Sequence, residues 1–200
     1  MSGIIGDNVG RASGLIKSAA VSQDAVKVAS GTITGGPSEL ILDGCFDTTY
    51  IWYELFLMDF WPSSDAVFYI QMRDGGATTT GSYYNSISSN PNASGSTPGH
   101  NMEGDWLENY GWEIAGNSAV NSSHSSSLTG KVIFFMAAGT KFQQVQWKTA
   151  FQESSEAGQW SGMLGHGNYL SKIAVYDGFR LYPSAGTMSG GFYTLIGYKQ

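Results

Sequence analysis

Apolar and polar side chains alternate with a period of two along most of this sequence, and no segment keeps the 3.6-residue period of an amphipathic helix. In VFYIQMR, Phe68, Ile70 and Met72 fall on one side of an extended chain, while Tyr69 and Arg73 fall on the other. The segment FQQVQWKTAFQ, residues 142–152, repeats the pattern with glutamine and lysine on its polar side. Both segments therefore predict strands with one buried and one solvated face.

Three further segments are apolar on both faces: YIWYELFLMDF (50–60), KVIFFMAA (131–138) and GFYTLIGY (191–198). With the remaining alternating segments, about ten strands follow one another at the short spacing of a β-sandwich or barrel. Between them, residues 85–101 and 116–130 are rich in Ser, Asn and Gly, and we expect exposed loops there. The sequence predicts an all-β antiparallel β-sandwich, with a jelly roll as the first choice of topology.

The first 23 residues differ from the rest of the chain. They hold glycines at short intervals and no clear period, with Ile4, Ile5, Leu15 and Ile16 as scattered apolar anchors. We expect residues 1–23 to form an extended N-terminal anchoring arm, and residues 24–200 to form a single sandwich domain.

Charge excludes some classes of partner. Only 13% of the residues are charged and the net charge is −6, so clustered Lys and Arg for binding nucleic acid are missing. The N-terminal segment lacks a continuous apolar run, so we expect neither a secretory signal nor contact with a membrane. The single cysteine, Cys45, rules out an intrachain disulfide.

Two strands predicted to be apolar on both faces need a cover for the second face. Phe192, Ile196 and Tyr198 point to one side of the closing strand, and Tyr193 and Leu195 point to the other. A neighbouring subunit or the protein's own long loops could supply the cover, and we favour the subunit. The residues expected at subunit or shell contacts are Ile4, Ile5, Leu15, Ile16, Trp52, Phe56, Phe192, Tyr193 and Tyr198.

Two aromatic-rich segments, GHNMEGDWLENYGW and GQWSGMLGHGNYL, offer a possible binding site. Aromatic rings stack on the apolar faces of sugars while Asn and Asp bind the hydroxyl groups, which makes carbohydrate binding one interpretation. Burial of the same rings at the ends of the sandwich is the other, and we favour it because Trp is highly buried on average. The candidate ligand-binding residues are Trp106, Tyr110, Trp112, Trp160 and Tyr169.

Few residues suggest catalysis. His100, His124 and His166 are far apart in sequence, match no metal-site spacing and are expected in solvated loops, so we expect no metal and no cofactor. Glu54 lies between Trp52 and Phe56 on one strand face, where a carboxylate is costly to bury without a partner. We expect an arginine or a backbone donor beside Glu54, and no enzymatic activity.

Several segments together resemble small structural proteins of tailed bacteriophages, especially those of marine and cyanobacterial hosts. They are Gly-Leu-Ile-Lys (14–17), YIWYELFLMDF (50–60), SSDAVFYIQMRDGG (63–76) and the ending Gly-x-Tyr-x-Leu-x-Gly-x-Lys (191–199). The resemblance implies a virion component made in the host cytoplasm: a capsid decoration or head-fibre protein, or a tail-associated protein. It also implies an oligomer, often a trimer, whose arm docks on the shell or tail.

The expected function is therefore that of a non-enzymatic structural protein of a virion, with its own copies and the major capsid protein or tail as partners. The alternative is a carbohydrate-binding β-sandwich that recognises a glycan on the host surface.

Overall fold

The chain folds into two antiparallel β-sheets that pack face to face. The computed structural model describes residues 25–79, 84–94, 97–115, 119–135, 143–154, 160–170 and 176–199. The proposed arm, with Ile4, Ile5, Leu15 and Ile16, lies outside the described residues. The predicted antiparallel β-sandwich is confirmed, whereas the jelly-roll strand order stays a prediction.

The described residues form thirteen strands and one short 3-10 helix. In chain order, they are β1 (Ala25–Ile33), β2 (Leu40–Leu42), β3 (Trp52–Pro62), β4 (Phe68–Asp74), β5 (Ala77–Thr78), β6 (Tyr84–Ser94), β7 (Thr97–Glu108), β8 (Trp112–Glu113), η1 (His124–Ser126), β9 (Leu128–Phe135), β10 (Gln143–Gln152), β11 (Trp160–Tyr169), β12 (Gly178–Pro183) and β13 (Met188–Tyr198).

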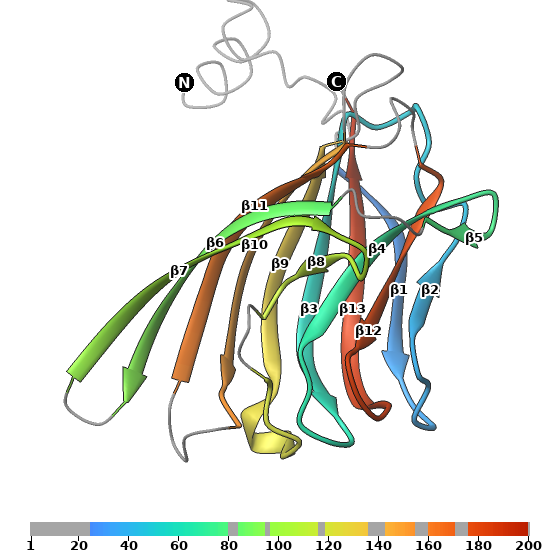
Figure 1. The fold of residues 1–200 in the computed structure, drawn as a ribbon. Helices are drawn as coiled ribbons and strands as arrows, with labels where there is room; N and C mark the ends of the chain where they lie inside the picture. Colours follow the sequence, from blue (N-terminus) through green and yellow to red (C-terminus); the bar gives the residue numbers. More distant parts are fainter. Residues whose placement is uncertain are drawn as a thin grey trace, which may run out of the picture.

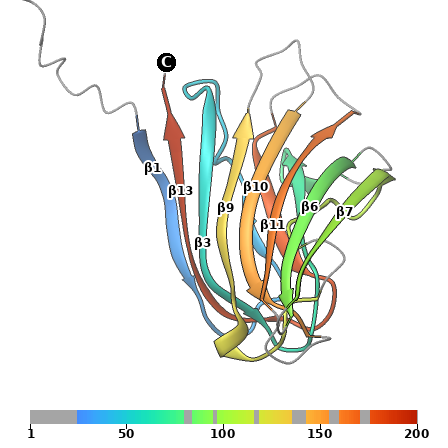
Figure 2. The ribbon, with the colours of Figure 1, turned by 90° about the vertical axis from the view of Figure 1, so that its left-hand side faces the viewer.

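Eight of the strands form a large, curved sheet in the order β1-β13-β3-β9-β10-β11-β6-β7 (Figures 1 and 2). The smaller sheet has the order β2-β12-β4-β5, and β8 pairs with β4. Because β13 pairs with both β1 and β3, the end of the chain lies inside the large sheet rather than at its edge. In this position the closing strand is protected by hydrogen bonds on both sides.

The inner faces of the two sheets share one apolar core. Phe134 of β9 stacks on Phe179 of β12 with ring centroids 5.2 Å apart, and Phe60 of β3 meets Phe68 of β4 edge to face. Cys45 is buried in the same core, and burial raises the pKa of its thiol to about 12. The small sheet therefore covers the inner face of the large sheet, and we call the opposite face of the large sheet its outer face.

The segment expected as the first exposed loop forms a hairpin instead. Residues 84–94 and 97–108 are the antiparallel strands β6 and β7, and β6 also pairs with β11. The prediction of a loop was wrong because Ser, Asn and Gly carry little strand propensity, while backbone pairing with a neighbouring strand depends on context. The second predicted loop, where it is described, holds η1 and the first residues of β9, and Val120 within it is fully buried.

Two strands of the large sheet change their buried face at adjacent irregularities. On β3, Tyr53, Leu55 and Leu57 point inward, and after Asp59 the inward positions shift by one so that Phe60 is buried. Asp59 has a positive φ of 53°, and its partner strand β13 has a register shift at Gly190 and Gly191. The double bulge explains why the predicted strand appears apolar on both faces, since part of the pattern records a switch of side.

Candidate functional site

The outer face of the large sheet, which faces away from the small sheet, carries an apolar patch on β3 and β13. The predicted alternation is confirmed there, because Leu195 is buried while Phe192 and Tyr198 lie on the other side of β13. Phe192 is 47% exposed and lies opposite Met58, which is 48% exposed. We define the β3–β13 patch as the six outward residues Trp52, Phe56, Met58, Phe192, Ile196 and Tyr198.

A charged group sits within the β3–β13 patch and is fully paired. Lys131 on β9 donates a hydrogen bond of 2.9 Å from Nζ to Glu54 Oε1, and the Tyr198 hydroxyl donates one of 2.9 Å to Glu54 Oε2. Burial and the Glu54 carboxylate raise the pKa of Tyr198, which keeps its hydroxyl a donor. The expected arginine or backbone partner of Glu54 was wrong, because cross-strand register places a lysine and a tyrosine there.

Aromatic stacking orders the end of the patch that holds Trp52 and Tyr198. The rings of Trp52 and Tyr198, directly opposite in the register of β3 and β13, are stacked with centroids 5.0 Å apart. The Lys131 ammonium also lies 5.9 Å from the centroid of the Phe56 ring. The patch is therefore an ordered surface in which the Glu54 carboxylate, the Lys131 ammonium and the Tyr198 hydroxyl have partners, as expected of a surface that loses contact with water on binding.

Beside the patch, a groove of about 470 Å³ crosses the outer face of β9, β10, β11, β6 and β7. Its lining residues include Lys131, Lys148, His166, Ile87, Met102 and Leu164. Lys131 lies directly opposite Lys148, and His166 directly opposite Ile87. Sequence reasoning missed this groove, since the alternation of β10 shows that Lys148 faces solvent but not which residue lies across from it.

Two of the three histidines lie on strands rather than in loops, and His124 is exposed in the connection between β8 and β9. His166 is on β11 and lines the groove, His100 is on β7, and His124 begins η1 with its ring 4.3 Å from that of Trp61. In the described part of the chain, no three His, Cys, Asp or Glu side chains are grouped so that they could hold a metal ion.

The proposed ligand-binding aromatics are not brought together. Trp112 is only 1% exposed and packs edge to face on Tyr84, whose ring centroid is also 4.6 Å from that of Tyr169 in the core. These two candidates take the buried positions that we favoured for such rings. Trp160 is 52% exposed at the start of β11 on the outer face of the large sheet. The side chain of Trp106 on β7 lies outside the described part of the structure.

Tyr110 lies on the other layer of the sandwich. It is 41% exposed, its ring centroid is 5.5 Å from that of Tyr69 on β4, and its carbonyl oxygen accepts a hydrogen bond of 2.5 Å from the Tyr182 hydroxyl. Burial and the nearby Glu113 carboxylate raise the pKa of Tyr69. Tyr110, in the connection between β7 and β8, thus packs against the small sheet, whereas Trp160 lies on the large sheet, and the two do not form one site.

Among the expected contact residues, Tyr193 points away from the patch. It packs against the core, and a side chain at Gly31 on β1 would collide with its ring. Trp52, Phe56, Phe192 and Tyr198 face outward as expected.

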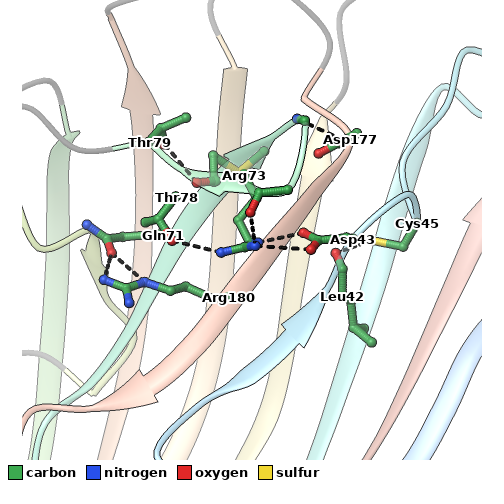
Figure 3. A network of polar contacts seen from close by, with 12 residues as sticks. Leu42, Asp43, Cys45, Gln71, Arg73, Thr78, Thr79, Asp177 and Arg180 are labelled. Carbon is green, nitrogen blue, oxygen red and sulfur yellow. Dashed lines mark hydrogen bonds and ion pairs between the residues drawn. The ribbon is translucent and has the colours of Figure 1, made fainter.

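The outer face of the small sheet carries a network of polar contacts that the sequence did not suggest (Figure 3). Arg73 on β4 donates to both carboxylate oxygens of Asp43, at 2.5 and 3.0 Å, and to Thr78 on β5. On the neighbouring strand β12, Arg180 donates hydrogen bonds to Gln71 and to Glu39. The hydrogen bonds from Arg73 are the main cause that lowers the pKa of Asp43. Since each charge has a partner, the network joins β2, β12, β4 and β5 and leaves no free charge for a ligand.

These observations define the protein as an antiparallel β-sandwich that carries an apolar patch and a groove on the outer face of its larger sheet. No protein-family model, no curated protein and no solved structure matches this chain. Within the described residues, no helix is long and apolar enough to cross a membrane.

Proposed function

We propose that the protein is a non-enzymatic structural component of a virion, which assembles by burying the β3–β13 patch on the outer face of its large sheet against neighbouring subunits. The observation that carries this proposal is the β3–β13 patch, where Met58 and Phe192 are about half exposed beside Trp52, Phe56 and Tyr198. Contiguous exposed apolar surface on a folded domain is characteristic of an interaction site.

The position of the patch supports association between copies. It lies on central strands of an ordered sheet, so the backbone is already satisfied and only side chains need a cover. Burying a side chain such as Phe or Met stabilises an interface by about 1.5–3 kcal/mol relative to leaving it in water. A homo-oligomer repeats this gain at every interface, because each subunit presents the same patch.

The resemblance to structural proteins of tailed phages gives the assembly its proposed setting. We place the protein on the virion as a capsid decoration or head-fibre protein, in trimeric form, with the arm of residues 1–23 docking on the major capsid protein or tail. A role that needs neither nucleic acid nor membrane fits the net charge of −6.

Light scattering after size-exclusion chromatography of the full-length protein tests the assembly. We expect a trimer, and we expect the double variant Met58→Ser/Phe192→Ser to dissociate at protein concentrations at least about 100-fold higher than the wild type. Ile41→Ser is the matched control, because Ile41 is 39% exposed but lies on β2 of the small sheet. A monomeric wild type, or a control variant that dissociates equally, would contradict the proposal.

Carbohydrate binding remains a second candidate, because Trp160 and Tyr110 present exposed rings within the described residues. If this function holds, Trp160→Ala or Trp106→Ala should abolish binding on a glycan array while the thermal unfolding temperature stays within about 2 °C of wild type. If the wild-type oligomer binds no glycan, carbohydrate binding is contradicted as a function.

A further inference from the structure

We propose that the groove across β9, β10, β11, β6 and β7 binds a small soluble anionic amphiphile, with a carboxylate head over its cations and an apolar body along its walls. This inference does not require the proposed assembly, because the groove lies on the strands beside the β3–β13 patch; Lys131, which contacts Glu54 and Phe56 of β3, borders both. The site has two parts, a cluster of positive groups and a set of apolar side chains.

The positive groups are concentrated by strand register. Lys131 on β9 and Lys148 on β10 are directly opposite each other, which places their Cβ atoms about 5 Å apart. Leu164 is the direct partner of Lys148 on β11, so His166, two residues further along, is its diagonal neighbour. Like charges directly opposite in a sheet are destabilising. A sheet that keeps such a pair in a chain of net charge −6 presents a local site for an anion.

Only one of the two lysines is neutralised. Glu54 accepts a hydrogen bond from Lys131, whereas Lys148 has no ion-pair partner among the residues that the structure describes. The Lys148 side chain is exposed on β10 and lines the groove. An incoming carboxylate therefore finds an ammonium group that no described residue pairs with, and an ammonium group is a strong donor to a carboxylate.

The walls of the groove are apolar. Ile87 is 47%, Leu164 50% and Met102 67% exposed, and they come from β6, β11 and β7. Leu164 lies opposite Ser89, which in turn lies opposite Met102, and Ile87 is the diagonal neighbour of Leu164 on β6. An alkyl chain that starts at Lys148 would thus contact Leu164 and Ile87 and pass Ser89 before it reaches Met102.

The dimensions of the groove favour a small molecule over a membrane or a protein surface. Its volume of about 470 Å³ lies in the range of small-ligand sites, which are mainly apolar with a few convergent polar groups. The charge is local, because Glu54 lies next to Lys131 on the same face. We therefore assign the site to a free carboxylate amphiphile.

Calorimetric titration of the full-length protein with three eight-carbon probes tests the assignment. The probes are octanoate, octyl glucoside and octyltrimethylammonium, each below its micelle-forming concentration, so that only the head group changes. We expect octanoate to bind at least about tenfold more tightly than octyl glucoside, and octyltrimethylammonium not to bind.

Three variants locate the binding. Lys148→Gln should weaken octanoate binding about tenfold, while Glu54→Gln should strengthen it because the Lys131 ammonium loses its carboxylate partner. Lys27→Gln is the matched control, since Lys27 is an exposed lysine on β1, at the far edge of the large sheet, and it should bind octanoate like the wild type. Unchanged unfolding temperatures ensure that the variants compare folded proteins.

Several outcomes would overturn the proposal. They are equal affinity for the neutral and the anionic probe, wild-type affinity in Lys148→Gln, and no binding of octanoate. Recruitment of the protein to vesicles of anionic lipid without binding of free octanoate would assign the groove to a membrane surface instead. A change in oligomeric state in Lys148→Gln would assign it to a second copy of the chain.

Discussion

The indole of Trp147 occupies the volume that a side chain at Gly165 would fill. The two residues are direct partners on β10 and β11, and a Cβ atom at Gly165 would lie 2.3 Å from the Trp147 ring. Two positions along β11, a Cβ atom at Gly167 would lie 2.6 Å from the indole of Trp112. Gly165 and Gly167 therefore leave room for two large rings, which the sequence pattern alone did not indicate.

Gly165→Ala should lower the free energy of unfolding by about 2–3 kcal/mol, because the added methyl group overpacks a core that has no space for it. Gly104→Ala on β7 is the control, since the nearest atom to its new Cβ, the carbonyl oxygen of Ser86, is 3.8 Å away. The control should change stability by no more than about 0.5 kcal/mol. Urea denaturation measures both, and equal effects of the two substitutions would show that Trp147 does not fill this space.

Contacts of single residues also explain why the candidate ligand-binding aromatics lie in different parts of the molecule. Nothing in the sequence distinguishes Trp112, which is buried, from Trp160, which is exposed, because both follow glycine or polar residues in aromatic-rich segments. The difference comes from their partners: Trp112 faces Gly167 and Tyr84, and Trp160 lies on the outer side of β11. Burial of an aromatic ring depends on what lies across the sheet, and a single strand pattern does not contain that information.

At the scale of elements, the alternating pattern predicted strand faces well and strand partners poorly. The inner face of β10, with Val145, Trp147 and Phe151, follows directly from its period of two. The hairpin of β6 and β7 escaped prediction because its stability depends on pairing with β11 rather than on its own apolar residues. The switch of the buried face of β3 at Asp59 was not predicted, because a bulge inserts one residue and leaves the composition of the strand unchanged.

The ion pair of Asp43 and Arg73 joins the residue after β2 to the C-terminal end of β4 and so helps to hold the small sheet together. Asp43→Asn should lower the free energy of unfolding at neutral pH by about 1–2 kcal/mol, because Arg73, which is only 7% exposed, loses its charged acceptor. Arg73 lowers the pKa of Asp43, so the contribution of the carboxylate is present above the unfolded pKa of about 4 and is lost as pH falls through the folded pKa.

Urea denaturation of the wild type and of Asp43→Asn, from pH 7 down to about pH 2, measures this dependence. The difference in stability between them should be largest at neutral pH and should shrink below about pH 4. A difference that stays constant over this range would mean that the charge of Asp43 contributes nothing.

For the molecule as a whole, the expectation of more apolar surface than one subunit covers came from strands 50–60 and 191–198. The structure places both in the large sheet and turns Phe56, Met58 and Phe192 to its outer face. The groove beside them could not be predicted, because it needs five strands in a register that only the folded sheet defines.

Deletion of residues 2–20 tests the proposed role of the arm in attachment. The described sandwich begins at Ala25, so the shortened protein should keep its thermal unfolding temperature within about 2 °C of wild type. Under the proposed function it should no longer attach to virus particles, which co-sedimentation with purified particles measures. A shortened protein that attaches normally would contradict a role of the arm in attachment. The double substitution of Ile4 and Ile5 by Ser should reproduce the loss of attachment.

The positions of Gly165 and Trp147 have one more consequence. Both belong to the floor of the groove, and the other side of that floor is the core. Since Gly165 has no side chain, the wall between ligand and interior there is a single layer of backbone over an indole ring. A ligand bound in the groove would contact the same atoms that hold the two layers of the sandwich together. Ligand binding should therefore stabilise the packing of the core.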